Sequence, residues 1–353
     1  MFVKSKVLSV SAKIASDSGK NARYAEVFQH FCRVSHNFIL MCKEVITISR
    51  YILRRLGATI IVVLCVLFIT FTMMRLAPGD PALMMLGDNS TQEQIQAMHA
   101  SLGLDKPLIV QFGIYLMNMF RGDFGTSLQF SQPCLSVVSR FFPRTLELAI
   151  AAGVIAVVIS IPLGIIAGVR QGSGVDLFCM FFAMIGQSLS VIVLGLILVI
   201  VFSVQLNWLP SMGTGGFQYL ILPALTLGLP QAAIITRMAR SGMIDVLKED
   251  YITATFARGI SSKKVYLKYA LKNALIPVIT IIGLSIANLL GGSVVTENIF
   301  GWPGLGTLVK TSITNRDYAL VQTIIMLIAV MVAIMNFLID IINSLIDHRI
   351  TMK

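Results

Sequence analysis

Long runs of apolar residues dominate the chain after residue 50 and alternate with shorter polar segments. A helix needs about 20 mainly apolar residues to cross the ~30 Å hydrocarbon core of a bilayer. A membrane barrel would instead require strands of about 10 residues in which apolar and polar positions alternate. The runs are continuous, so the pattern predicts an all-α polytopic membrane protein. Six transmembrane helices are expected, at 51–74, 145–169, 177–204, 219–238, 274–295 and 319–346.

The third predicted helix is longer than a single crossing requires, because it covers about 28 residues. Gln187, Ser188 and Ser190 interrupt its apolar run. We therefore expect this helix to be bent or tilted in the membrane.

Basic residues are distributed unevenly between the two sides of the predicted helices. Residues 1–55 contain ten Lys or Arg against three acidic residues, and residues 239–272 contain seven against three. Residues 75–144 contain five of each sign, and residues 204–218 contain none. Segments rich in Lys and Arg stay on the cytoplasmic side of a membrane. Both termini and residues 239–272 are therefore predicted to be cytoplasmic, and the net charge of +11 reflects topology rather than nucleic-acid binding.

The composition fits a membrane protein and divides the chain into two regions. Charged residues make up only 13% of the sequence, whereas a soluble domain carries about 25%. Residues 1–48 are expected to form a cytoplasmic N-terminal extension, unless Met41 is the true start. Residues 49–353 are expected to form the transmembrane domain, with an outer loop at 75–144 and a cytoplasmic segment at 239–273.

The sequence carries no pattern that predicts catalysis or metal binding. Residues 301–306 are rich in glycine but lack the lysine and the following Ser or Thr of a phosphate-binding loop. The four histidines lie outside the predicted helices and form no H-E-x-x-H pair, and the five cysteines lack metal-ligand spacing. We expect no catalytic residue, no metal site and no cofactor bound by this chain, which is therefore not predicted to be an enzyme.

Ionisable residues inside the predicted helices are few. Glu147 and Asp340 both lie near predicted membrane ends. A proton-coupled carrier would place essential carboxylates closer to the middle of the bilayer. Such a carrier is therefore retained only as a remote alternative.

Residues 245–277 form an amphipathic segment in which Gly259 separates two helical halves. The second half interleaves lysines with apolar residues. A short helix, a glycine turn and a second helix would form a projection able to dock in a groove of a soluble partner. The same pattern also fits a helix that lies on anionic lipid. The first half places apolar or small residues at helical spacing, namely Val246, Tyr251, Ala254 and Ala257.

Short motifs along the chain resemble those of a known transporter family. Residues 249–252 (EDYI) and 257–259 (ARG) resemble the cytoplasmic signature of permeases from ATP-binding-cassette (ABC) importers. Over residues 50–350 the chain is similar to the dipeptide/oligopeptide/nickel permease family, first-permease type. It departs from that family at Ala254-Thr255, where the family usually has Thr-Ala. The other matching motifs, in order, are at 77–81, 102–107, 122–125, 144–148, 297–306 and 315–318.

The resemblance implies a multi-subunit importer in the bacterial cytoplasmic (inner) membrane. A second homologous permease would share the substrate path, and two cassette ATPases would use ATP and Mg on the cytoplasmic side. A substrate-binding protein would dock on the outer side. Membrane lipid surrounds the chain, and no nucleic-acid partner is expected. The expected cargo is di- or oligopeptides; nickel, a nickel chelate or glutathione are alternatives with the same architecture.

The resemblance also implies roles for two sets of residues. A coupling helix between transmembrane helices 4 and 5 would bind the ATPase. An outer segment would form a gate or bind the substrate-binding protein, or alternatively act as an interfacial aromatic anchor with a rigid turn. The coupling residues are Glu249, Asp250, Tyr251, Ala254, Arg258 and Gly259, and the outer residues are Glu297, Trp302, Pro303 and Gly304.

Overall fold

The computed structural model describes residues 53–76, 91–102 and 105–346. Regular structure within these ranges is helical, apart from one isolated bridge between Thr126 and Pro133. The prediction of an all-α protein is therefore confirmed. The expected N-terminal extension at 1–48 and the motif at 77–81 lie outside the described residues.

The chain divides into two compact units. Of the described residues, 53–57 belong to one unit and 58–346 to the other. The helix Leu53–Leu76 begins in the first unit and continues into the second. The remaining described elements all belong to the second unit.

Five helices in the described part of the chain are long and apolar enough to cross a membrane, and a broken pair of helices brings the number to six if it counts as one span. This agrees with the six predicted from the apolar runs. The spans are the helix Leu53–Leu76, α6 (Cys134–Val169), α9 (Phe217–Leu247), the stretch Ser262–Gly291 that leads into α12 (Leu271–Phe300), and Tyr318–Asn343 within α14 (Tyr318–Ile346).

The broken pair replaces the third predicted helix. Helix α7 (Gly174–Ser188) and helix α8 (Val191–Leu198), which continues as the π-helix η1 (Val199–Gln205), meet at an angle of 108°. Leu189 and Ser190 have extended backbones, which interrupt the helical hydrogen bonds between the two parts. The predicted bend is confirmed, but it is a complete break rather than a gentle curve.

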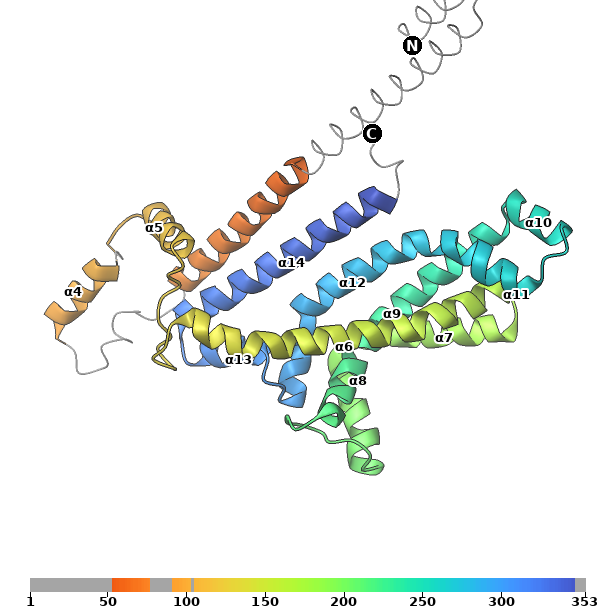
Figure 1. Cartoon of the computed structure of the whole chain (residues 1–353). Coiled ribbons are helices and arrows are strands. Elements are labelled where there is room, and N and C mark those ends of the chain that lie inside the picture. The colour runs from red at the N-terminus through yellow and green to blue at the C-terminus, as the bar shows by residue number, and fades with distance from the viewer. Residues whose placement is uncertain (1–52, 77–90, 103–104, 347–353) are drawn as a thin grey trace, which may run out of the picture. The chain divides into compact units, whose positions relative to one another are not determined.

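Helices α6 and α9 pack backbone against backbone, and Figure 1 shows them running side by side. A Cβ atom on Gly164 would lie 2.5 Å from the Cβ of Ala239, and one on Gly168 would lie 2.7 Å from the Cβ of Met243. At Gly228 the nearest atom would be the carbonyl oxygen of Ala152, at 2.7 Å. Small residues at these crossing points allow the close approach that stabilises helix pairs in lipid.

The predicted outer loop contains helices of its own. Helix α4 (Gln92–Leu102) and helix α5 (Leu108–Phe120) lie within it, and α6 begins at Cys134 rather than at residue 145. The rings of Phe112 and Tyr115 on α5 pack at a tilt against the ring of Phe71 of the first membrane helix, with centroid distances to that ring of 5.6 and 5.5 Å. The short helix α13 (Leu305–Thr314) connects α12 to α14.

Candidate functional site

The predicted cytoplasmic projection exists as a short helix, a glycine turn and a second helix. Helix α10 (Asp250–Ala257) follows α9 after the extended residue Glu249. The chain then turns at Gly259 and enters α11 (Ser262–Lys264), the π-helix η2 (Val265–Ala270) and α12. Figure 1 shows α10 and α11 together beyond the ends of α9 and α12.

One face of α10 is anchored in a small apolar core. The side chain of Ile252 is only 1% exposed and packs in a cluster with Met243 of α9, Val265 of η2 and Ala274 of α12. Thr255 is also buried, and its hydroxyl donates a hydrogen bond to the carbonyl oxygen of Tyr251 at 2.6 Å. The buried face therefore joins α10 to both adjoining membrane helices.

The opposite face of α10 is free to meet a partner, because all six residues predicted for coupling are exposed. Tyr251 is 39% exposed, and its hydroxyl accepts a hydrogen bond from the side-chain amide of Asn273 at 2.8 Å. That bond links the exposed face of α10 to the first turn of α12. The structure thus brings the six residues into one surface segment, while their role in coupling stays a prediction.

Position 259 requires glycine because of its backbone conformation, not because neighbouring atoms leave no room for a side chain. Its φ angle is +75°, in the left-handed region, and no atom lies within 4 Å of where a Cβ would stand. Residues with a side chain rarely adopt this conformation, whereas glycine does so at little cost. The turn that redirects the chain from α10 toward α12 therefore depends on glycine at this position.

On the opposite end of α12, the carboxylate of Glu297 is fully buried and hydrogen-bonded. The hydroxyls of Thr145 and Ser293 donate to its Oε1 at 2.8 and 2.9 Å. The backbone N–H groups of Gly306 and Thr307 donate to its Oε2 at 2.6 and 3.2 Å. This single side chain therefore connects α6, α12 and the start of α13.

Two glycines make room for this carboxylate. A Cβ on Gly304 would overlap the carboxylate of Glu297, and a Cβ on Gly306 would overlap the backbone of Val294. Gly301 ends α12 in the left-handed conformation with φ of 59°. The glycine-rich motif at 297–306 is thus a tightly packed corner, in which glycine is needed for space at two positions and for conformation at a third.

Trp302 belongs to the same corner and is only 2% exposed. Its indole Nε1 donates a hydrogen bond to the carbonyl oxygen of Arg144 on α6 at 2.9 Å. The alternative interpretation as an interfacial aromatic anchor is therefore wrong. Glu297, Trp302 and Gly304 lie inside the subunit, and only Pro303 of the four predicted outer residues is partly exposed. A direct role in gating or partner binding stays a prediction.

A second buried carboxylate, which was not predicted from the sequence, lies at the start of α14. Asp317 accepts hydrogen bonds from the hydroxyl of Ser127 at 2.5 Å and from the backbone N–H of Gln129 at 3.2 Å. It also accepts from the backbone N–H of Leu320 at 3.2 Å, as a helix cap does. The end of the outer loop is thereby attached to α14. The motif at 315–318 marked the position but gave no sign of this partner.

An ion pair between α7 and α9 was also missed. The Arg240 guanidinium donates to both oxygens of Asp176, at 2.6 and 2.7 Å, and the backbone N–H of Gly172 donates to the same carboxylate at 2.9 Å. The side chains are 26% and 3% exposed. Such two-point pairs fix geometry as well as charge. The pair spans 64 positions of sequence, so no local pattern predicts it.

The described residues include those that bear on metal binding and on a proton-coupled carrier. Among them, no group of three or more His, Cys, Asp or Glu side chains is placed to hold a metal ion. Glu147 is exposed and pairs with Arg144 at 3.0 Å. Asn343 of α14 accepts a hydrogen bond from Thr280 of α12 at 2.6 Å, which joins two helices within the subunit.

Two regions of the chain match families of transport proteins. Residues 48–149 match the N-terminal family of binding-protein-dependent transport system membrane components. Residues 160–352 match the family described as binding-protein-dependent transport system inner membrane component. Together the two matches cover most of the sequence, including α10 and the corner around Glu297.

Relatives of similar length support the same assignment. The "Probable peptide ABC transporter permease protein y4tP" of Sinorhizobium fredii (strain NBRC 101917 / NGR234) is 39% identical over 308 residues, which cover 85% of this chain and 98% of that protein. The glutathione transport system permease protein GsiC of Escherichia coli (strain K12) is 40% identical over 304 residues, covering 86% and 99%.

A solved structure has the same fold. An inward-facing structure of the MetNI methionine ABC transporter (CY5 native crystal form) matches with a TM-score of 0.53 at 20% identity, covering 60% of this chain and 97% of the matched chain. At that identity the likeness concerns the fold alone. Family, relatives and fold agree, and the chain belongs to the family of binding-protein-dependent transport system inner membrane components, as a multi-pass ABC importer permease of its dipeptide/oligopeptide branch.

Proposed function

We propose that this chain is one permease subunit of an ATP-driven importer that carries di- or oligopeptides across the bacterial inner membrane. The coupling segment and both termini face the cytoplasm, because the positive-inside rule places Lys- and Arg-rich segments there. The observation that carries the proposal is the geometry of α10, a helix with one face anchored in the core and the other exposed. Such a helix suits docking into a groove of a soluble partner.

In the proposed mechanism, α10 transmits movement of an ATPase to the membrane helices. Two cassette ATPases bind ATP and Mg, and each contacts the α10 of one of two homologous permeases. When the ATPases close, α10 moves with its groove, and Ile252 carries the displacement into α9 and α12. The Tyr251–Asn273 hydrogen bond provides a second connection to α12. A substrate-binding protein delivers cargo from the outer side.

Glutathione is a second candidate cargo, because a glutathione permease is among the relatives of about 40% identity. Glutathione is itself a small peptide, so both candidates share the same chemistry of amide groups and charged ends. The permease architecture is the same for either cargo, and selection is expected to rest mainly in the binding protein.

We propose that the outer corner shapes the outer end of the transport path without touching cargo directly. Glu297 and Trp302 hold the connection between α12 and α13 against α6, which fixes the position of exposed neighbours. In this proposal the corner is the rigid support of a gate, and residues such as Pro303 form its accessible surface.

The test is uptake by proteoliposomes that contain this chain with the subunits encoded beside it. A panel of dipeptides, glutathione and nickel would be offered with and without ATP. We expect ATP-dependent uptake of peptides, and its loss in the Glu249→Arg variant, which reverses an exposed charge directly before α10. A Glu93→Arg variant, which reverses an exposed charge on α4 away from α10, is the control. Uptake that needs no ATPase and follows a proton gradient would refute the proposal.

A further inference from the structure

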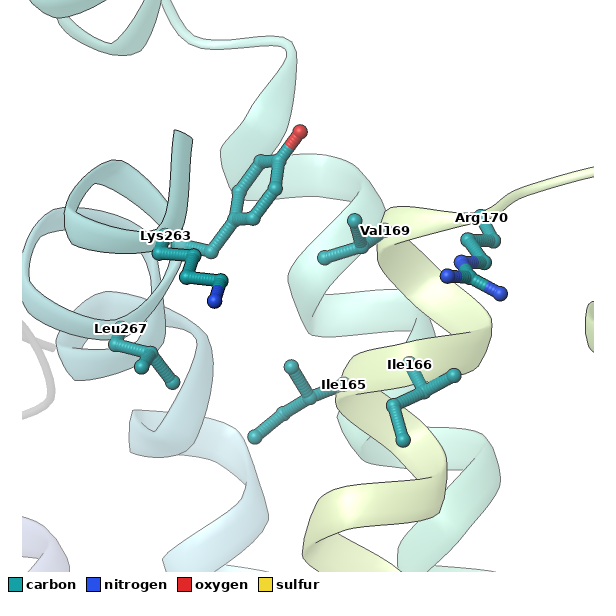
Figure 2. A pocket seen from close by; sticks show the side chains of 7 residues that line it. Ile165, Ile166, Val169, Arg170, Lys263 and Leu267 are labelled. Carbon is teal, nitrogen blue, oxygen red and sulfur yellow. The ribbon is translucent and has the colours of Figure 1, made fainter. Parts of the chain in front are cut away.

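An open groove lies between the last turns of α6 and the segment that links the coupling helix to α12. The volume of this groove is about 420 Å³. Figure 2 shows α6 on one side of the groove and the residues of α11 and η2 on the other. The lining residues are Ile165, Ile166, Val169, Arg170, Lys263, Tyr266 and Leu267.

The groove combines an apolar wall with two cationic side chains. Leu267 is 62% exposed and Ile166 is 44% exposed, so aliphatic surface is open at this site. Lys263 lies in α11 on one side of the groove, and Arg170 follows the end of α6 on the other, with its side chain directed away from Lys263 in Figure 2. Neither side chain forms an ion pair or a hydrogen bond within the part of the chain that the structure describes.

The position of the groove places its apolar wall and its two cationic side chains at a membrane boundary. Ile165, Ile166 and Val169 are the final apolar residues of a membrane-spanning helix, and Arg170 is the first residue beyond it. Long basic side chains at such ends direct their charge toward the headgroup layer. The apolar wall therefore faces the acyl-chain region while the cations face the lipid headgroups.

We propose that this groove binds one anionic phospholipid. Its phosphate binds Lys263 and, once the side chain of Arg170 turns toward the groove, the guanidinium of that residue as well, and an acyl chain covers Ile166 and Leu267. Basic pockets between membrane helices on the cytoplasmic side are suited to acidic headgroups. The guanidinium and the ammonium group both donate charge-assisted hydrogen bonds to phosphate oxygens. A free phosphate would leave the aliphatic surface in water, so the combined chemistry favours a lipid.

The bound lipid would also touch the link between coupling helix and membrane domain. Tyr266 and Leu267 belong to η2, a six-residue π-helix directly before α12. Wide helical turns of this kind are uncommon and often occur at functional sites. Lipid in the groove would brace η2 against α6. Binding itself is independent of the proposed transport function, but an effect on coupling rests on it.

Native mass spectrometry of the purified full chain, with any subunits that copurify, tests the binding. The protein would be extracted from nanodiscs of phosphatidylglycerol or of phosphatidylcholine. Wild type should retain phosphatidylglycerol selectively, and the double variant Arg170→Gln with Lys263→Gln should retain at least about tenfold less. The matched control, Arg237→Gln with Lys264→Gln, removes two exposed cations outside the groove and should retain the wild-type amount.

Two further measurements distinguish a bound lipid from a misfolded groove and from a protein occupant. The exchange of Arg170→Lys with Lys263→Arg keeps both charges and should restore retention, whereas a merely misfolded groove would not recover. A photoreactive group at position 267 should capture phospholipid. Capture of another protein subunit at that position, equal loss in the control variant, or equal retention of the two lipids by wild type would overturn the proposal.

Discussion

Replacing Gly259 tests whether the turn after α10 governs coupling. Because φ is +75° and no atom lies within 4 Å of the Cβ position, Gly259→Val introduces backbone strain without a clash at Cβ. The left-handed conformation costs an ordinary residue roughly 1–2 kcal/mol. That cost lowers the population of the native turn by a factor of about 5–30. We expect uptake per ATP hydrolysed to fall, because α10 no longer holds one orientation toward α12.

Gly122 provides a matched control for the same strain in the predicted outer loop, away from α10. Its φ is +83° and no atom lies within 4 Å of its Cβ position. Gly122→Val should therefore carry a similar local cost while leaving coupling intact. Gly259→Asn should restore part of the uptake, because asparagine tolerates the left-handed region better than valine.

The assay measures ATPase rate and peptide uptake in parallel in proteoliposomes. The expected result for Gly259→Val is ATP hydrolysis that persists while uptake falls severalfold, with normal assembly of the subunits. If Gly122→Val uncouples the two rates as strongly as Gly259→Val, or if Gly259→Val leaves their ratio unchanged, the assigned role of the turn is refuted.

Three further substitutions test the packing of the subunit. Ile252→Ala should destabilise the anchor of α10 by about 2–5 kcal/mol, seen as faster limited proteolysis of the coupling segment. Asp176→Asn leaves the Arg240 charge without its partner and should cost on the order of 3 kcal/mol; adding Arg240→Gln should recover part of the thermal stability. Glu297→Gln weakens charge-assisted hydrogen bonds and should cost about 2–3 kcal/mol, whereas unchanged thermal unfolding in detergent would contradict the network.

The sequence predicted the membrane helices well because long apolar runs have few alternatives in lipid. It placed the start of α6 too late, since hydropathy detects lipid-facing surface and not helix length. The first turns of α6 contain Arg140, Pro143 and Arg144, which the apolar pattern excluded, yet the helix continues through them. The break in the third span was located correctly, but its angle depends on the backbone conformations of Leu189 and Ser190.

The helix–turn–helix shape of residues 245–277 was largely predictable from sequence, because the signals for it are local. Gly259 separates two amphipathic stretches, and the structure places a left-handed turn there. The ion pair of Asp176 with Arg240 and the network around Glu297 depend on residues distant in sequence. Which of many charged residues meet is decided by the packing of helices. The sequence therefore predicted the exposed turn at Gly259 better than the buried contacts of Asp176 and Glu297.

The close packing of α6 and α9 restricts how the subunit can change shape. Gly164, Gly168 and Gly228 leave almost no layer of side chains between the two backbones. Sliding one helix along the other would drive these glycines into bulkier neighbours, so shear at this interface is blocked. Any rearrangement of the membrane helices would then move α6 and α9 together as one rigid unit, with bending confined to other positions such as the break at Leu189–Ser190.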